Sequence, residues 1–411
     1  MRILQINSVY ETGSTGKIVK YIHELLVKKN YESYVAYGRG RHDNQAFLIK
    51  TENKIDLYIH GIVTRLFDNH GFASYKSTVN FLKTIESLQP SLLHLHNLHG
   101  YYINVQLLFD FIKKKNIPIV WTLHDCWAFT GHCCVFGYVG CSKWKTGCFK
   151  CPQKKQYPSS FFIDASKKNY ERKKKLFTGV NKLKIVVPSR WLFELLKDSF
   201  LNEYEIEIIY NGIDLDSFMP TENKFRKNNF LLDKFIILGV ANVWNKRKGL
   251  RYFLELSKYI QKDDIIVLVG LKKKQLKNLP KNIIGVGKIF NIMQLADIYS
   301  SADVFVNPTL DDNFPTTNIE ALACGTPVIT FETGGSPEAV YQGVGIVVKN
   351  KSVKDLHNAI EYIKNNKNEF SAETCREIAV NKFDYKKNFM RYLEIYKEMV
   401  LPCAGSADAV E

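Results

Sequence analysis

The sequence predicts an α/β protein made of two successive doubly wound units, each with a parallel sheet. Short apolar runs alternate with segments whose apolar residues recur at helical spacing, and this pattern starts twice along the chain. The 411 residues exceed the usual size of one hydrophobic core, and the hydrophobic fraction of 45% is ordinary for a globular chain. Strands joined by helical crossovers form parallel sheets, so two such sheets are expected.

The first unit opens with a strand over residues 2–7, and the turn Gly13-Ser14-Thr15-Gly16 leads into a helix. Further elements follow in chain order: strand 91–95, helix 105–112, strand 117–123 and strand 184–187. Ligands of open parallel sheets bind outside the carboxyl ends of the strands. The loops that follow these strands are therefore the places to search for a site.

The pattern restarts after Asn211-Gly212-Ile213-Asp214. The predicted elements are strand 235–240, helix 250–260, strand 265–269, helix 292–300, strand 304–307, helix 318–323, strand 328–331, strand 346–348 and helix 385–399. We expect an N-terminal domain over residues 1–212, a C-terminal domain over 213–384 and a terminal helix over 385–400 that crosses back to the N-terminal domain. The small, polar residues 401–411 are expected to fray.

The net charge, the apolar runs and the first residues of the sequence indicate where the protein is located and what it binds. No run of 18 apolar residues occurs and the first residues do not resemble a signal peptide, so a cytoplasmic protein is expected. A net charge of +16 calls for an anionic partner, although clusters such as Arg172-Lys173-Lys174-Lys175 are also typical of solvated faces. A phosphate-bearing substrate and peripheral contact with an anionic membrane are the favoured accounts, and nucleic acid is the less favoured one.

Two carboxylates, Asp312 and Glu320, flank the start of one predicted helix. Asp312 lies in the loop after strand 304–307, and Glu320 lies in the first turns of the helix that follows. Carboxylates accept hydrogen bonds from sugar hydroxyls, and the free N–H groups of a helix N-terminus suit phosphate or hydroxyl oxygens. Helix capping and a solvated glutamate would explain either residue alone.

The whole segment from Asp311 to Ile329 resembles the acid-x7-acid signature of the retaining GT-B glycosyltransferases of family GT4, close to E-G-x6-E-A-x-A-x-G-x-P-V. The resemblance extends over most of the chain, through the opening glycine turn, His124-Asp125, Val187-Pro188-Ser189, Asn211-Gly212-Ile213-Asp214, Lys248-Gly249 and Ala302-Asp303-Val304. It implies the GT-B fold, with two Rossmann-like domains facing a central cleft. It also implies sugar transfer from a nucleotide-sugar donor with retention of configuration and no catalytic cofactor.

The resemblance assigns roles to single residues. Glu320 would hold the donor ribose, and Asp312 would hold the sugar. The segment Asn313, Phe314, Pro315 and Thr316 would bind the donor, largely through its backbone. Asp312 and Asn313 stand where the family more often has Glu and Gly, which shortens the reach of the carboxylate. Family members of this style build capsule, exopolysaccharide or lipopolysaccharide, so a saccharide or polyprenyl-diphosphate-linked acceptor and a place on the inner face of the membrane are expected.

A basic loop, Asn245-Lys246-Arg247-Lys248-Gly249, follows strand 235–240. Fixed cations stabilise a departing nucleoside diphosphate without a metal ion, so Arg247 and Lys248 are the candidates for the diphosphate. The family has an Arg five positions before the Lys, where this chain has Val243, and Arg247 is expected to replace it. A basic loop that merely caps a helix is the alternative.

The N-terminal half holds three further candidates. Gly13 and Gly16 lack the spacing of a P-loop, but their turn resembles the family loop that approaches the donor. His124 follows strand 117–123, and the resemblance places it against the donor sugar with Asp125 steadying its imidazole. The cluster His94 to Gly100 is interpreted as lining of the acceptor side.

Six of the nine cysteines fall between residues 126 and 151. Such density in a cytosolic chain favours a metal site over disulfides, and Cys148-x2-Cys151 has a zinc-knuckle spacing. Cys133, Cys141, Cys148 and Cys151 are the predicted ligands of a structural zinc ion, within a cysteine-rich insertion at 126–156. Cys134 in place of Cys133 and a set of free thiols are the alternatives.

Three other classes of protein compete with a glycosyltransferase. A dinucleotide-dependent oxidoreductase would need G-x-G-x-x-G after a first strand, and neither half has it. A sugar-nucleotide epimerase can share the architecture but would need no acceptor. A non-catalytic basic module that binds polyanions or membranes would explain the charge and leave the acidic pair unused.

Overall fold

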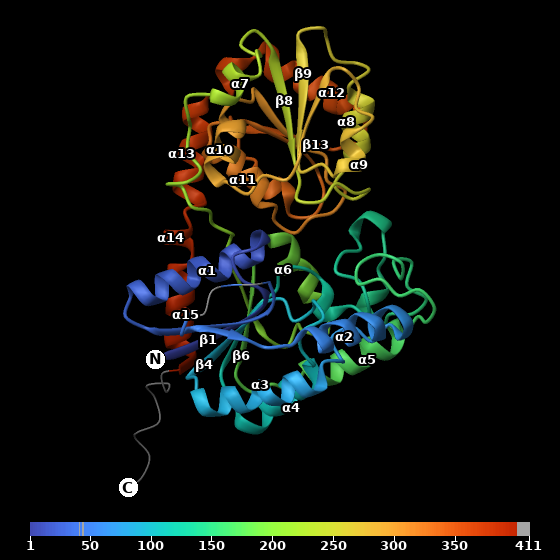
Figure 1. Ribbon diagram of the computed structural model, residues 1–411, viewed down its shortest axis with the longest axis vertical. Helices are drawn as coiled ribbons and strands as arrows, with labels where there is room; N and C mark the ends of the chain where they lie inside the picture. The colour runs from blue at the N-terminus through green and yellow to red at the C-terminus, as the bar shows by residue number, and fades with distance from the viewer. Residues whose placement is uncertain (41, 43–44, 401–411) are drawn as a thin grey trace. The chain divides into compact units, whose positions relative to one another are not determined.

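The computed structural model describes residues 1–40, 42 and 45–400 and divides them into two compact units (Figure 1). The first unit comprises Met1–Ile209 and the chain from Phe389 on, and the second comprises Tyr210–Asn388. Residues 401–411, for which the sequence predicts fraying, lie outside the described residues. No helix in the described part of the chain combines the length and the apolar character that crossing a bilayer requires.

The first unit contains a seven-stranded parallel sheet in the order β3-β2-β1-β4-β5-β6-β7. Its strands are β1 (Arg2–Val9), β2 (Glu32–Arg39), β3 (Leu48–Lys50), β4 (Leu92–Leu95), β5 (Ile119–Thr122), β6 (Leu183–Val187) and β7 (Glu205–Ile208). All residues of β4, β5 and β6 are buried. Strands covered on both faces read as continuous apolar runs, which is why the sequence marks them clearly.

Helices cover both faces of this sheet. They are α1 (Gly13–Lys28), α2 (Lys54–Phe67), α3 (Tyr75–Leu88), α4 (Val105–Lys115), α5 (Ser166–Phe177), α6 (Arg190–Lys197) and α15 (Met390–Val400). In Figure 1, α1 lies on one side of the strands, and α3 and α4 lie on the other. Between β5 and α5 the chain has only three 3-10 turns, Trp127–Phe129, Gly137–Val139 and Lys143–Lys145.

Helix α15 packs against α1, β4 and β5, so the end of the described chain belongs to the first unit. The hydroxyl of Tyr396 hydrogen-bonds to Nδ1 of His94 at 2.6 Å, and the hydroxyl of Tyr392 pairs with Thr122 Oγ1 at 3.0 Å. Lys184 is bridged by Glu398 at 3.0 Å. These polar contacts, of which the two tyrosine contacts are buried, fix the helix on strands that lie 214 to 302 residues earlier.

The second unit contains a six-stranded parallel sheet in the order β10-β9-β8-β11-β12-β13. Its strands are β8 (Phe235–Val240), β9 (Asp264–Val269), β10 (Ile283–Val286), β11 (Val304–Asn307), β12 (Val328–Phe331) and β13 (Gly345–Val348). Its helices are α7 (Lys224–Asn228), α8 (Leu250–Leu256), α9 (Lys273–Leu276), α10 (Ile292–Ser300), α11 (Thr316–Ala323), α12 (Val353–Asn365), α13 (Ala372–Lys382) and α14 (Tyr385–Asn388), with 3-10 turns at Ser336–Ala339 and Lys367–Glu369.

Helix starts follow a common local rule. In six helices the residue before the first turn accepts a hydrogen bond from a backbone N–H of that turn, which satisfies one of its free donors. These residues are Asn53, Asn104, Ser189, Asn291, Ser352 and Ser371. The caps set where the helices begin, while the buried faces set how they pack.

The structure changes several predicted bounds. The helix expected over 250–260 ends at Leu256, and α11 begins two residues earlier than expected, at Thr316. The terminal helix expected over 385–400 is two helices, with α14 in the second unit and α15 in the first. The Arg172 to Lys175 cluster is not a fully solvated face, because Lys173 is buried.

The tyrosine hydroxyls of α15 offer a test of its docking. Tyr396→Phe should lower the free energy of unfolding by about 1–3 kcal/mol, because Nδ1 of the buried His94 loses its partner without loss of apolar contact. Urea denaturation monitored by tryptophan fluorescence measures the change. Tyr75→Phe, at an exposed position, is the control, and equal stability of both variants would contradict the docking role of this hydrogen bond.

Candidate functional site

The loops that follow β8 and β11 meet through a charge pair. Nζ of Lys248, in the loop after β8, donates to Oδ2 of Asp312, in the loop after β11, at 2.5 Å. Nη1 of Arg247 lies 3.7 Å from the same carboxylate oxygen. The three charged residues predicted to hold the sugar and the diphosphate therefore lie together at the carboxyl ends of neighbouring strands, where ligands of parallel sheets bind.

Backbone contacts hold the two loops in this arrangement. The backbone carbonyl of Arg247 accepts from the N–H of Leu310 at 2.8 Å. The guanidinium of Arg247 donates to the carbonyl of Asp311 at 2.5 Å. Gly249 has a φ of +76°, and a Cβ there would lie 2.2 Å from the carbonyl oxygen of Pro308. A side chain at Gly249 would push the basic loop away from the loop that carries Asp312.

The carboxylate of Asp312 is held in its charged form. Burial raises its pKa, but Lys248 and Arg247 act in the opposite direction and the hydrogen bond from Lys248 adds to them, so the pKa falls below its ordinary value. The N–H of Asn313 also donates to Oδ1 at 3.1 Å. Asp312 is thus an acceptor for hydroxyl groups at neutral pH.

A glycine pair after β12, which the sequence analysis did not single out, also shapes this loop. The N–H of Gly335 donates to the carbonyl of Asp312 at 3.0 Å, and a Cβ on Gly334 would lie 1.9 Å from that carbonyl oxygen. Gly334 has a φ of +57°. The position of Gly334-Gly335 in the loop that follows a buried strand is the signal that could have identified this pair.

Glu320 lies on α11 and is almost completely buried. The hydroxyl of Tyr299, on α10, donates to its Oε2 at 3.0 Å. Tyr299 was not among the predicted residues, because a tyrosine in a helical apolar pattern reads as core. Its hydroxyl fixes the orientation of the carboxylate that the family resemblance assigns to ribose.

The segment Asn313 to Thr316 forms the entrance to α11. The ring of Phe314 is buried and packs near Tyr210 and Phe383, so this residue has only its backbone to offer a ligand. Pro315 precedes the first turn of α11, which has neither a side-chain cap nor an acidic residue. The N-terminus of α11 therefore keeps donor capacity for an anionic group.

The candidates of the first unit lie at the carboxyl ends of β1 and β5. Gly13 opens α1 with a φ of +67°, and the carbonyl of Gly16 accepts from the N–H of Glu11 at 3.1 Å, which closes the turn. His124 follows β5, and its Nε2 pairs with Nδ1 of His96 at 3.1 Å. Burial lowers the pKa of His124 to about 4, so the imidazole is neutral at pH 7.

The structure adds detail to two expectations about the histidines. The carboxylate of Asp125, which the resemblance places beside the imidazole of His124, binds Nε2 of His99 at 2.7 Å and accepts from the N–H of Trp127 at 2.9 Å. Within the His94 to Gly100 cluster, which is interpreted as lining of the acceptor side, His94 is not open to a ligand, because its side chain is buried between β5 and α15.

The four cysteines predicted as zinc ligands line one cavity in the segment between β5 and α5. The lining is Thr130, His132, Cys133, Phe136, Cys141, Lys143, Trp144, Cys148, Phe149, Cys151 and Pro152. Cys126 and Cys134, from the same segment, are not on it. The fold thus separates the six clustered cysteines into a set of four and two others.

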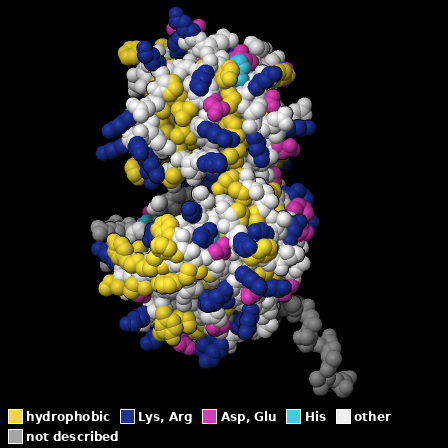
Figure 2. Space-filling view, turned by 90° about the vertical axis from the view of Figure 1, so that its right-hand side faces the viewer, with side chains coloured by type: hydrophobic (Ala, Val, Ile, Leu, Met, Phe, Trp, Pro, Cys, Tyr) yellow, Lys and Arg dark blue, Asp and Glu magenta, His cyan; other side chains and the backbone are white. Residues whose placement is uncertain are grey.

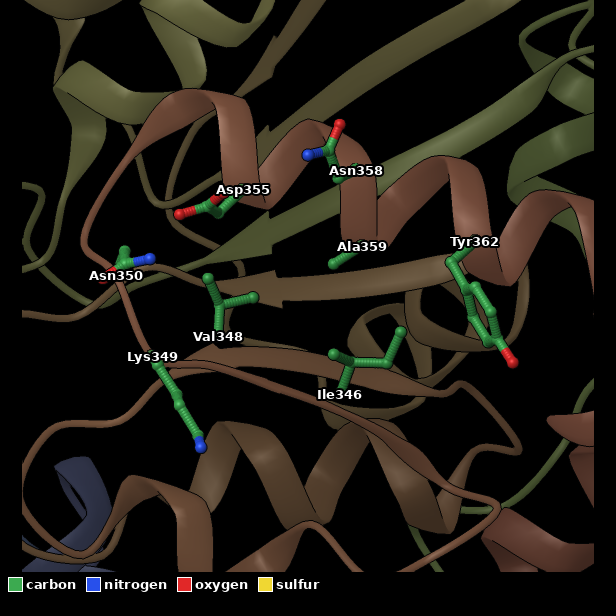
Figure 3. Close-up of a pocket in the computed structure, with 8 residues that line it drawn as sticks. All are labelled: Ile346, Val348, Lys349, Asn350, Asp355, Asn358, Ala359 and Tyr362. Atoms are coloured by element: carbon green, nitrogen blue, oxygen red, sulfur yellow. The ribbon is translucent and has the colours of Figure 1, made fainter.

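A second hollow lies between β13 and α12 (Figure 3). It is lined by Ile346, Val348, Lys349, Asn350, Asp355, Asn358, Ala359 and Tyr362. None of these residues is among the predicted site residues, and most of the lining is aliphatic or amide. This hollow carries no arrangement of groups suited to chemistry.

Comparison with known proteins agrees with the geometry. The family described as Glycosyltransferase Family 4 matches residues 15–217, and the family described as Glycosyl transferases group 1 matches residues 220–384. The chain is 26% identical over 379 residues to a putative colanic acid biosynthesis glycosyl transferase, WcaC, of Escherichia coli K12, covering 87% of this chain and 89% of that protein.

A second relative is the UDP-Gal:alpha-D-GlcNAc-diphosphoundecaprenol alpha-1,3-galactosyltransferase of Escherichia coli, 27% identical over 226 residues, which is 50% of this chain and 57% of that protein. Among solved structures, sucrose-phosphate synthase from Thermosynechococcus elongatus superposes with a TM-score of 0.73 at 18% identity, over 97% of this chain and 99% of the other. That likeness confirms the GT-B fold. The chain belongs to the GT4-type glycosyltransferases, of the kind found in bacterial surface-polysaccharide biosynthesis.

Proposed function

We propose that this glycosyltransferase binds a nucleoside diphosphate sugar at the carboxyl ends of β8 and β11 and transfers the sugar to a saccharide on a lipid diphosphate carrier. The observation that carries the donor assignment is the meeting of Lys248, Arg247 and Asp312 beside the N-terminus of α11. Cations and helix N–H groups bind phosphate oxygens, and a charged carboxylate binds hydroxyls. The acceptor assignment is supported by the galactosyltransferase relative, whose acceptor is alpha-D-GlcNAc-diphosphoundecaprenol.

In this proposal Lys248 and Arg247 carry the charge of the departing diphosphate, in place of a metal ion. Glu320, oriented by Tyr299, holds the ribose hydroxyls, and Asp312 holds the sugar. The bond from the anomeric carbon to the diphosphate breaks, and the acceptor hydroxyl attacks from the same face, so configuration is retained. The acceptor proton passes to the leaving phosphate oxygen, and no separate base is needed. The roles of Gly13, Gly16 and His124 toward the donor remain predictions.

The experiment that tests this function has two steps. Calorimetry with UDP-, GDP- and ADP-sugars in the presence of EDTA identifies the donor. The donor is then incubated with an undecaprenyl-diphosphate saccharide, and mass spectrometry detects the added sugar. Binding and sugar addition with EDTA support the proposal. A change in the donor sugar without any acceptor would favour an epimerase, and strict dependence on Mg²⁺ would refute the role given to Lys248 and Arg247.

A membrane contact is the second part of the proposal, and helix α2 carries it. The buried side of α2 is polar, with Asp56, His60 and Thr64. Asp56 accepts from the N–H of Ser77 at 3.0 Å, and His60 pairs with Ser74 at 2.8 Å. The exposed side of α2 is apolar, which is the reverse of an ordinary surface helix.

We name this surface the α2 face; it consists of Ile55, Tyr58, Ile59, Ile62, Leu66 and Phe67 of α2 with Phe161, Phe162 and Ile163 of the loop before α5, all at least one-third exposed. The N–H of Phe161 donates to the carbonyl of Arg65, so loop and helix form one surface. Figure 2 shows hydrophobic side chains gathered on one side of this unit with Lys and Arg side chains beside them.

The occupant that fits the α2 face is a bilayer with anionic lipids. The exposed charges of α2 are Lys54 and Arg65, both basic, and Lys155, Lys167 and Lys168 flank the loop in sequence. Apolar side chains insert at the boundary between headgroups and acyl chains, and basic ones bind anionic headgroups. This contact would bring the enzyme to a lipid-linked acceptor.

Glu320→Gln should lower kcat/KM by about 10- to 100-fold, because it keeps the shape and the contact with Tyr299 but removes the charge that strengthens hydrogen bonds to hydroxyls. Initial rates of sugar transfer measure it. Glu373→Gln, an exposed acid of the same unit, is the control. Unchanged turnover in Glu320→Gln would remove this carboxylate from the donor site.

Lys248→Met should weaken binding of the cognate nucleoside diphosphate by about tenfold or more, since a hydrogen bond to a charged group contributes about 1.5–3 kcal/mol. The matched control is Lys246→Met, an exposed lysine of the same loop, which should bind normally. Calorimetry with the nucleotide alone separates binding from chemistry. Equal affinities of the two variants would contradict the diphosphate role.

Replacing Ile59 and Ile62 together by Gln should reduce binding to phosphatidylglycerol-containing vesicles about tenfold, because apolar burial is lost while the buried polar side of α2 is untouched. Vesicle co-sedimentation measures it, and transfer to a water-soluble acceptor should stay normal.

The control for this vesicle experiment is Phe290→Gln with Met293→Gln, at exposed apolar positions of the second unit. Equal vesicle binding by all variants would refute the membrane role of the α2 face. Dimerisation of the wild type without lipid, abolished by the Ile59 and Ile62 changes, would instead assign the face to a second copy of the chain.

A further inference from the structure

The cysteine cavity between β5 and α5 takes no part in the proposed transfer, and it has the chemistry of a metal site. We propose that it binds one structural zinc ion through the thiolates of Cys133, Cys141, Cys148 and Cys151. The spacing C-x7-C-x6-C-x2-C brings four sulfur ligands from one segment, and these four, of the six cysteines in the region, line the cavity. Four-sulfur tetrahedral coordination is a usual form of structural zinc.

Contacts among the thiols support this assignment. The thiol of Cys133 hydrogen-bonds to the sulfur of Cys151. The N–H of Gly131 donates to Sγ of Cys148 at 3.2 Å. A Cβ on Gly131 would lie 2.0 Å from the carbonyl oxygen of Ser166, so only glycine lets this backbone approach the sulfur. Hydrogen bonds of this kind orient the thiolates of metal sites.

His132 is an independent sign of a ligand at this position. Its side chain is fully buried and lines the same cavity as the four cysteines. Nδ1 pairs with Oδ1 of Asp68 at 2.5 Å, whereas Nε2 is buried with no hydrogen-bond partner. Buried polar atoms are rarely left unpaired, and with Nδ1–H donated to Asp68 the neutral imidazole has a lone pair on Nε2, so this nitrogen calls for a hydrogen-bond donor or a cation in the cavity.

The buried Lys173 points to negative charge in the same region. Its Nζ donates to the carbonyls of Trp127 at 2.7 Å and Thr130 at 3.1 Å and lies 3.5 Å from the centre of the Trp127 ring. Burial lowers its pKa to about 7, while the nearby cysteines, if ionised, and the carboxylate of Asp68 act in the opposite direction. A zinc ion with four thiolates carries a net double negative charge, which would stabilise the ammonium group.

A second group of metal-ligating atoms exists in the described part of the chain. Ligand atoms of His99, Asp125 and Cys134 all lie within 4.8 Å of one another, a closer grouping than the four cavity thiols have. We favour the thiols because His99 and Asp125 already bind each other at 2.7 Å and His99 pairs with Tyr157 at 3.2 Å. On zinc binding, Cys141 and Cys148 would move toward the contact between Cys133 and Cys151.

Zinc would stabilise a segment that has little regular secondary structure of its own. Between β5 and α5 the described chain forms only short 3-10 turns, packed around the rings of Phe129, Phe136 and Trp144. An ion joined to four points of the chain fixes such a loop because its binding free energy adds to folding. The inference concerns stability and goes beyond the transfer chemistry.

Elemental analysis of the full chain, purified without chelators, tests the site. The wild type should contain about one zinc per chain, and Cys148→Ser combined with Cys151→Ser should lose at least nine-tenths of it. The matched control is Cys134→Ser, which should keep its zinc. Loss of zinc in Cys134→Ser with retention in the double variant would overturn the proposal in favour of the group with His99 and Asp125.

X-ray absorption at the zinc edge keeps the test decisive if the double variant fails to fold. The wild type should show four sulfur neighbours at about 2.3 Å. A shell with nitrogen or oxygen ligands would overturn the four-thiolate assignment, and folded wild type with less than about one-tenth of a zinc per chain would overturn the site. Neither measurement depends on a sugar donor or acceptor, so failure here is distinguishable from failure of the proposed function.

Discussion

The contact between Lys248 and Asp312 is the interaction on which the candidate donor site depends. It joins the loop after β8 to the loop after β11, and these two strands are neighbours in the sheet. The two paired residues are 64 positions apart in the sequence. The contact keeps a carboxylate charged inside a mostly buried loop, and it holds two cations beside the start of α11. A ligand with both phosphates and hydroxyls would meet its complementary groups there.

The backbone around this contact is built to bring the loops close. Gly249 and Gly334 each approach a carbonyl oxygen more closely than any side chain would permit, and both have positive φ. Such positions combine conformational freedom with absence of a Cβ, which is why glycine occupies them. The carboxylate of Glu320 is positioned by a side chain, because the hydroxyl of Tyr299 donates to it and fixes its orientation.

The first unit uses buried polar networks for a different purpose. Polar residues of α2 bond inward to Ser74 and Ser77, and this leaves the apolar side of the helix exposed. Asp125 bonds to His99, and His124 pairs with His96. On α2 hydrogen bonding decides which side of the helix is exposed, since a buried polar group without a partner costs free energy.

The sequence by itself determined the two parallel-sheet units, most strands of their centres and the acidic and basic loops, because buried strands are apolar runs and sites follow their carboxyl ends. It also put forward Cys141, Cys148 and Cys151 with either Cys133 or Cys134 as metal ligands, and only the structure places Cys133 on the cavity with the other three. Only the tertiary structure decided that Lys248 pairs with Asp312, that Tyr299 orients Glu320 and that α2 presents an apolar face. These depend on packing between segments far apart in the chain, which local periodicity and spacing do not encode.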